Sequence, residues 1–304
     1  MSVLVVDKPV GPTSFAVLRR VRRALMRAPD AAKRAPKLGH GGTLDPMASG
    51  VLPVCVGEAT KVIPFLLDAD KEYLAGVRFG VETDTLDATG QVLSETAVGN
   101  LDSGRVEAAL ASFRGEIEQV PPMFSALKHH GQPLYRYARA GQTIARAPRR
   151  LTVHELVLLA FEPPDRARLR IRCSKGTYIR SLAADLGRQL GVGAHLTELR
   201  RTASGPFRLA QAVGLDDIEA WVDQGRELPF VSLREALAHL PAVTVGDALA
   251  VRLARGQRVQ WDELGSGVAE RGPLCVLLPA DIVVAVVDRN TEGAVRILRV
   301  FNVG

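Results

Sequence analysis

A single carboxylate lies in the most unusual stretch of this chain, residues 39–54, with the sequence GHGGTLDPMASGVLPV. Four glycines and an Asp-Pro pair are combined there with an apolar run, a composition typical of a tight loop that lies close to another group. An ionised side chain such as Asp45 can act as a nucleophile or stabilise a developing charge. Asp followed by Pro is also an ordinary helix start, with Asp as the N-cap and Pro at the first helical position. The spacing alone leaves both interpretations open.

Arg180 is a second candidate because of where the surrounding pattern places it. Leu169 and Ile171 alternate with arginines and predict a strand, and after a turn at Gly176 the apolar residues recur at helical spacing. Arg180 then falls in the first turn of a helix, where a cation opposes the helix dipole by about a few tenths of a kcal/mol. This position is easier to explain if a carboxylate lies opposite Arg180.

Two further elements present side chains of interest. The turn DKPVGPTS follows a short apolar strand and leads, with Thr13 or Ser14 as the cap, into a helix that has one apolar face and one arginine face. In KEYLAGVRFG, the residues alternate from Tyr73 to Phe79, which predicts a strand. Most strand tyrosines are simply half-buried in packing, so this pattern by itself gives Tyr73 no further role.

The formal net charge of +6 is unevenly distributed along the chain. Residues 1–40, 128–150 and 165–208 together carry +20, so the remainder carries −14. Such segregation predicts a basic face for a polyanion on an otherwise acidic body. Histidines and tyrosines are interleaved with the basic residues of the middle segment, which favours nucleic acid over charges that merely solvate exposed helices.

Length and composition predict one large domain and one small one, since 304 residues with 47% hydrophobic content can bury a sizeable core. No apolar run approaches the roughly 20 residues that cross a bilayer, and the N-terminus lacks a signal-peptide pattern, so no membrane association is expected. Cys55, Cys173 and Cys275 are far apart and flanked by apolar residues. They predict buried thiols in a reducing cytoplasm, and neither disulfides nor zinc ligands.

Several ordered motifs within residues 1–210 resemble the TruB family of tRNA pseudouridine synthases. The motifs are KPVGPTS, GHGGTLDPMASGVLPV, PPMFSALKHHGQPLYRYARAG, SKGTYIRSLAADLG and LTELRRTASGPF. The resemblance implies an α+β fold with a large central, mainly antiparallel β-sheet flanked by helices and loops. It also implies that Asp45 is the catalytic aspartate, that Arg180 pairs with it, and that Tyr73 contacts the target base in the active site.

The same resemblance implies further contacts with RNA. Tyr178 would line the pocket together with Tyr73, and Leu199 would touch the base. Because the target base is normally stacked inside a folded RNA arm, the enzyme would have to flip it out, and His40 would enter the vacated space. The implied substrate is uridine 55 in the T arm of elongator tRNAs, and the expected enzyme is a monomer with no obligate protein partner.

The implied reaction breaks the bond from the ribose to nitrogen 1 of uridine, rotates the detached base and rejoins it through carbon 5. It needs no redox cofactor and no metal, but it does need a carboxylate, a proton acceptor and a site that retains the base. Asp45 can attack ribose carbon 1 or base carbon 6, or help to form a glycal, and the sequence leaves the three routes open. Tyr73 is a possible proton acceptor, although a phenol with a pKa of about 10 is a poor base unless its surroundings change it.

The C-terminal part follows a different pattern. Beyond Phe207 come short helices, and from about Pro241 short strands alternate with turns. This part resembles a small PUA domain, an RNA-binding β-barrel, so we expect a catalytic domain over 1–238 and a PUA-like domain over 239–304.

Two other classes of function stay open at this point. One is a non-catalytic RNA-binding or tRNA-folding module, which would explain the distribution of charge without any chemistry. The other is a guide-RNA-dependent rRNA pseudouridylase. The first predicts that Asp45 is dispensable, and the second predicts that the isolated protein is inert on tRNA.

Overall fold

The computed structural model describes residues 2–28, 36–265, 268 and 272–301. The chain forms two compact units, which we call the terminal unit and the central unit. The terminal unit comprises Met1–Leu44, Val51–Ala69 and Ser204–Gly304, and the central unit comprises Asp45–Gly50 and Asp70–Ala203. The central unit therefore contains every candidate site residue named above except His40.

Most elements of the central unit are strands. Its helices and strands are β4 (Lys71–Phe79), β5 (Val81–Thr83), β6 (Val92–Glu95), α3 (Ser103–Leu110), β7 (Gly115–Gln119), β8 (Lys128–His129), β9 (Gln132–Pro133), α4 (Leu134–Arg139), β10 (Arg149–Glu162), β11 (Arg166–Cys173), α5 (Ile179–Gln189) and β12 (Ala194–Ser204). The strand order is β12-β4-β11-β10-β7, and β4, β11, β10 and β7 pair antiparallel. A three-residue parallel pairing joins the start of β3 (Ala48–Val56) to β12, so the strand pairing is mixed.

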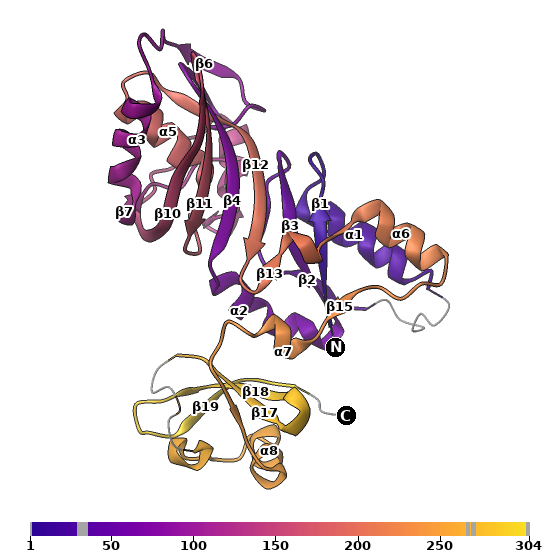
Figure 1. Cartoon of the computed structure of the whole chain (residues 1–304). Coiled ribbons are helices and arrows are strands. Elements are labelled where there is room, and N and C mark those ends of the chain that lie inside the picture. The colour runs from indigo at the N-terminus through magenta and orange to yellow at the C-terminus, as the bar shows by residue number, and fades with distance from the viewer. Residues whose placement is uncertain (1, 29–35, 266–267, 269–271, 302–304) are drawn as a thin grey trace. The chain divides into compact units, whose positions relative to one another are not determined.

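Alternation along the strands explains which face of this sheet is covered. In β4 every second residue from Lys71 is buried, Tyr73 and Phe79 included, and in β11 Leu169 and Ile171 are buried while the arginines between them point outward. This is the pattern that the sequence predicts. Helices α3 and α5 pack against β10 and β4, respectively, and their ribbons lie together beside the strands in Figure 1.

The terminal unit collects elements from both ends of the chain. Apart from β3, its helices and strands are β1 (Ser2–Lys8), α1 (Ser14–Leu25), β2 (Leu38–His40), α2 (Ile63–Asp68), β13 (Phe207–Arg208), β14 (Val213–Gly214), α6 (Leu215–Asp223), β15 (Phe230–Val231), α7 (Leu233–Ala236), β16 (Ala242–Thr244), α8 (Asp247–Ala254), β17 (Leu274–Leu278), β18 (Ile282–Arg289) and β19 (Val295–Val300). Strand β1 pairs with β14 and β15, and β2 pairs with β3.

Helix α1 begins as the sequence predicts, but its arginine face is only partly open to solvent. Thr13 is the N-cap, and its side chain accepts a hydrogen bond from the amide of Ala16. Helix α6 lies alongside α1 (Figure 1) and presents Glu219 to Arg20, with an Nε–Oε1 distance of 2.8 Å. Arg20 also pairs with Asp216 of α6, and a third ion pair joins Arg27 to Asp223 of that helix. The carboxylates of α6 therefore neutralise part of the basic charge that the sequence places on this helix.

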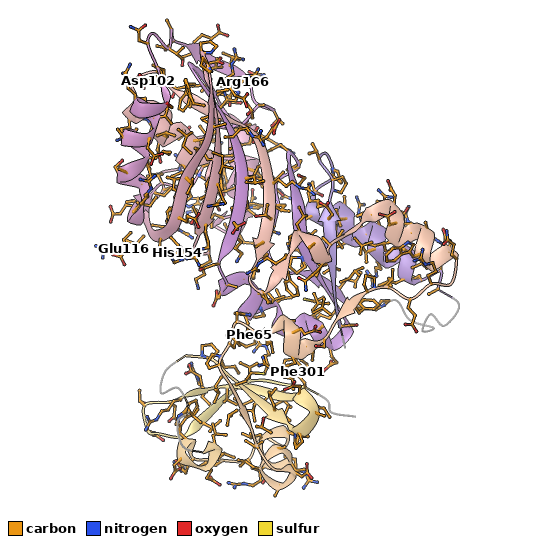
Figure 2. All side chains as sticks on the ribbon, in the orientation of Figure 1. Phe65, Asp102, Glu116, His154, Arg166 and Phe301 are labelled. Carbon is orange, nitrogen blue, oxygen red and sulfur yellow. The ribbon has the colours of Figure 1, made fainter. Side chains whose placement is uncertain are left out.

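The small C-terminal sheet has the order β16-β17-β18-β19, which agrees with the β-rich C-terminal part that the sequence predicts. Residues of this sheet share one buried apolar cluster with residues of β1, β3 and α2. Phe65 and Phe301, both labelled in Figure 2, belong to that cluster. The boundary between residues 238 and 239 stays a prediction.

All three cysteines are buried and free of disulfides, and burial raises the pKa of the Cys173 thiol to about 11. Among the residues that the structure describes, no helix has both the length and the apolar character needed to cross a membrane.

The mixed α+β class and the large, mainly antiparallel sheet that the sequence predicts are confirmed.

Candidate active site

The loop that carries Asp45 is a turn and not a helix start. The amide of Ala48 donates to the carbonyl oxygen of Asp45 at 3.1 Å, which closes a four-residue turn with proline at its second position. Pro favours this position because its fixed φ suits the turn. Five residues after Asp45, Gly50 has φ +101°, and a Cβ built there would lie 2.2 Å from the carbonyl oxygen of Arg201. The glycines predicted that the loop lies close to another group, and at Gly50 its main chain does lie close to that of Arg201 in β12.

The Asp45 carboxylate is paired with Arg180. Arg180 Nε donates to Asp45 Oδ2 at 2.9 Å, across 135 positions of sequence. The Arg180 side chain is only 4% exposed, whereas the Asp45 side chain is 37% exposed. The arginine is thus a fixed, buried cation, and the carboxylate is partly open to solvent.

Three other groups hold the Arg180 guanidinium in place. Its two terminal nitrogens donate to the carbonyl oxygens of Thr85 and Phe124, at 2.9 and 2.8 Å. The third group is Asp87, whose Oδ2 lies 3.7 Å from Arg180 Nε. A planar guanidinium can make these contacts at once because its donors point in fixed directions. The position of Arg180 in the helix predicts one carboxylate opposite it, and the structure has two, Asp45 and Asp87.

Asp87 is the site residue that the sequence interpretation missed. Its side chain is 7% exposed, and its Oδ1 accepts hydrogen bonds from the Thr85 hydroxyl at 2.8 Å and from the Thr89 amide at 3.0 Å. In the sequence, TDTLDATG has the composition of an acidic, turn-rich connection. Its Thr-x-Asp-x-Thr spacing was the available signal, since such short polar side chains satisfy one another within a turn. What the spacing could not show is that the turn lies next to Arg180.

Tyr73 lies in the buried face of β4 beside Arg201 of β12. Burial raises the pKa of the Tyr73 phenol, and the positive charge of Arg201, together with a hydrogen bond from it, acts in the opposite direction as a smaller effect. A raised pKa means that the phenol holds its proton more tightly than free tyrosine does. This direction of shift makes the phenol a weaker base than free tyrosine at the same pH, and both suggested roles of Tyr73, proton acceptor and wall of the site, stay predictions.

Replacing Tyr73 with Phe is expected to lower turnover by less than about tenfold, because a wall needs the ring and not the hydroxyl. A general base would contribute roughly 10²–10⁴-fold. The measurement is the single-turnover rate of both proteins between pH 6.5 and 9, at saturating RNA. We expect the ratio of the two rates to stay constant, because the phenol remains protonated throughout. A parent-to-variant rate ratio that rises with pH would instead support Tyr73 as the proton acceptor.

The other candidate residues occupy different parts of the structure. Tyr178 is the N-cap residue of α5, and burial raises its pKa, with the Asp45 charge contributing in the same direction. Leu199 is buried in β12, where it pairs with Ala48. Ala48 is the third residue after Asp45. The structure thus gathers Asp45, Tyr73, Tyr178 and Arg180, with Leu199 beside the loop. His40 lies in the terminal unit, on β2 opposite Val54.

No group of three or more His, Cys, Asp or Glu side chains suited to a metal ion occurs in the described part of the chain. The site as it stands offers a charge-paired carboxylate, a buried cation and two phenols. Such a set can supply an anionic nucleophile and aromatic surfaces for a planar substrate.

Two families of sequence match this chain. Residues 30–179 match the TruB family pseudouridylate synthase (N terminal domain), and residues 180–240 match the tRNA pseudouridylate synthase B C-terminal domain. A Chromohalobacter salexigens protein named tRNA pseudouridine synthase B is 51% identical over 267 residues, covering 86% of this chain and 83% of that relative. A Burkholderia mallei protein of the same name is 48% identical over 293 residues, covering 96% of this chain and 93% of the relative.

Solved structures agree with the sequence matches. The chain is similar to one from a Cbf5-Nop10-Gar1 complex, with a TM-score of 0.78 and 30% identity, over 99% of this chain and 85% of that one. It is also similar to one from an H/ACA RNP bound to a substrate RNA, with a TM-score of 0.75 and 28% identity, again over 99% and 85%. Fold, site and relatives together define an isomerase, a pseudouridine synthase. Within that class, the chain belongs to the TruB family.

Proposed function

We propose that this protein converts uridine to pseudouridine at position 55 of tRNA, in the T arm. Membership of the TruB family supports the reaction, and the two relatives described above are named as tRNA-modifying enzymes. The observation that carries the proposal is the partly exposed carboxylate of Asp45, held by the buried Arg180.

The two carboxylate oxygens of Asp45 would have different tasks. Oδ2 accepts the hydrogen bond from Arg180, whereas Oδ1 makes no hydrogen bond to any residue that the structure describes. Oδ1 is therefore the oxygen that would face the nucleoside. In the overall change, the bond between ribose carbon 1 and nitrogen 1 breaks, a bond from the same carbon to base carbon 5 forms, and the proton on carbon 5 is lost while nitrogen 1 gains one. Asp45 would act at ribose carbon 1, at base carbon 6 or in forming a glycal.

The surrounding residues would hold the flipped nucleotide. Tyr73 and Tyr178 would supply aromatic surfaces for the base, and Leu199 an apolar contact that keeps the detached base in place. His40 would enter the space that the base leaves in the RNA. Flipping costs a few kcal/mol of stacking, which aromatic contacts of roughly 1–3 kcal/mol each can offset.

The basic segment 128–150 would bind the RNA backbone. It forms a two-strand turn, β8 and β9, followed by helix α4, where Arg136 and Arg139 are exposed. Arg139 stacks on Tyr135, and Tyr137 donates a hydrogen bond to the His129 carbonyl oxygen at 3.2 Å. At the far end of the segment, Arg149 is close enough to Tyr178 to lower its pKa. The segment therefore begins as a compact surface feature and ends beside the candidate site.

A salt titration tests this surface. For the parent, the logarithm of affinity for a T-arm stem-loop should fall linearly with the logarithm of salt concentration. Changing Arg136 and Arg139 together to Ala should reduce the slope by about 0.7–0.9 for each phosphate that the variant no longer binds. The matched control changes Arg20 and Arg27 to Ala, because the carboxylates of α6 already neutralise those two side chains. Equal slopes for the parent and the Arg136/Arg139 variant would remove this segment from the RNA interface.

The proposed function is tested by mapping pseudouridine at nucleotide resolution after purified protein has been incubated with unmodified tRNA. We expect one modified position, 55, without added guide RNA or partner protein, and a monomer by sedimentation. Modification only after a guide RNA is added would favour the guide-RNA-dependent class of pseudouridylase. Tight binding with no modification would favour a non-catalytic module. We also propose a cytoplasmic location, which suits the three buried thiols.

A further inference from the structure

Two buried side chains far from each other in sequence make the same unusual contact with the main chain next to the reacting pair. Each is 2% exposed, and each binds both the amide and the carbonyl of a single residue. The first is Ser14, which contacts Leu44, the residue directly before Asp45. The second is Gln119, which contacts Tyr178, two residues before Arg180.

The Ser14 hydroxyl is fully used by Leu44. Ser14 Oγ accepts from the Leu44 amide at 2.9 Å and donates to the Leu44 carbonyl oxygen at 3.0 Å. The side-chain cap of α1 is supplied by Thr13, the residue before Ser14, so Ser14 takes no part in capping the helix. On the other side of Asp45, its own carbonyl closes the turn to Ala48. The main chain is thus fixed on both sides of the carboxylate.

The Gln119 amide makes the corresponding pair of contacts. Gln119 Oε1 accepts from the Tyr178 amide at 2.8 Å, and Gln119 Nε2 donates to the Tyr178 carbonyl oxygen at 3.0 Å. Tyr178 is the N-cap residue of α5 and has no side-chain cap of its own. Gln119 therefore fixes the point at which the helix carrying Arg180 begins.

We propose that Ser14 and Gln119 are positioning residues, which hold the main chain beside Asp45 and Arg180 so that the two side chains meet in the reactive geometry. Neither side chain makes a hydrogen bond to the side chain of Asp45 or Arg180 in the described part of the chain. The physical reason is that a displacement of about 1 Å of a reacting group can cost roughly 100-fold in rate. The proposal rests on the proposed function only in taking Asp45 and Arg180 as the reacting pair.

The test compares Ser14→Ala and Gln119→Met with matched controls. Thr13→Ala removes an exposed hydroxyl–amide hydrogen bond at the same helix start, and Gln189→Met removes an exposed glutamine hydrogen bond to Ser112. In single turnover at saturating RNA, we expect the two buried variants to be roughly 10- to 100-fold slower, with RNA affinity within about threefold of the parent. The controls should keep the parental rate. Rates are compared at whichever uridine the parent modifies, so a wrong assignment of position 55 leaves the comparison intact.

Amide hydrogen exchange supplies a readout that needs no substrate. Ser14→Ala should speed exchange at Leu44 and leave Tyr178 unchanged, and Gln119→Met should do the reverse. Should either variant fail to fold, Ser14→Cys and Gln119→Glu retain part of the hydrogen bonding and should fall between variant and parent. Parental rates in folded variants, unchanged exchange at Leu44 and Tyr178, or rates that fall only in step with RNA affinity or with the midpoint of thermal unfolding would each overturn the proposal.

Discussion

Asp45→Asn protein is expected to bind T-arm RNA within a few-fold of the parent and to form no detectable pseudouridine. Asn has nearly the same shape, and the turn to Ala48 uses the main-chain carbonyl, so the loop should keep its conformation. The amide oxygen can still accept from Arg180. It carries no negative charge, however, and therefore cannot act as an anionic nucleophile or stabilise a cationic sugar.

Both halves of this result are needed. Binding is measured by equilibrium titration with a T-arm stem-loop, and turnover by nucleotide-resolution mapping after long incubation. Mass spectrometry should verify that position 45 remains Asn, because a trace of Asp would mimic activity. Turnover by verified Asn protein would end the catalytic assignment, and joint loss of binding and thermal stability would indicate a purely structural role for Asp45.

Arg180→Ala is expected to lose nearly all activity and, in contrast to the change at Asp45, to lose stability as well. The guanidinium contacts two carboxylates and two carbonyl oxygens. Its removal leaves Asp87 buried without this cation, and breaking a buried pair costs about 3–5 kcal/mol. Thermal unfolding should therefore shift to lower temperature by several degrees.

Two further variants separate charge from geometry. Arg180→Lys keeps the charge but lacks the planar fork, so it should restore most of the stability and only part of the rate. Arg188 lies on the same helix, where its side chain is 67% exposed and pairs with Asp185, so Arg188→Ala is the matched control. It should behave like the parent, since exposed pairs contribute roughly 0–1 kcal/mol. Near-normal turnover by Arg180→Ala would show that the pair has no part in catalysis.

Local patterns predicted the elements of this fold well. Alternation identified β4 and β11 and the faces that they bury, and helical spacing identified α1 and α5. The position of Arg180 in the first turn of α5 predicted a carboxylate opposite it, and the structure contains the contact with Asp45. These inferences succeed because burial on one face imposes a period on the sequence.

What local patterns missed depends on contacts between distant segments. The neutralisation of Arg20 requires α6, 196 to 199 positions away, and the contact of Gln119 with Tyr178 spans 59 positions. Helix capping and a turn give Asp-Pro the same local signal, so only the hydrogen bond to Ala48 decides between them. Asp87 was overlooked for a related reason, because a polar turn has the same composition whether it faces solvent or a buried arginine.

The order of the two units along the chain limits how such an enzyme can be rearranged by recombination. Asp45–Gly50 belong to the central unit, but terminal-unit residues precede and follow them in the chain. A gene fragment for residues 70–203 would encode Arg180, Tyr73 and Tyr178 without the carboxylate. Any crossover between codons 45 and 180 would bring an aspartate and an arginine from different parents into one protein. Shuffled variants should therefore stay active only where the Asp45 loops and the α5 helices of the two parents are interchangeable. Residues 45–180 are the smallest block that takes both members of the pair from one parent.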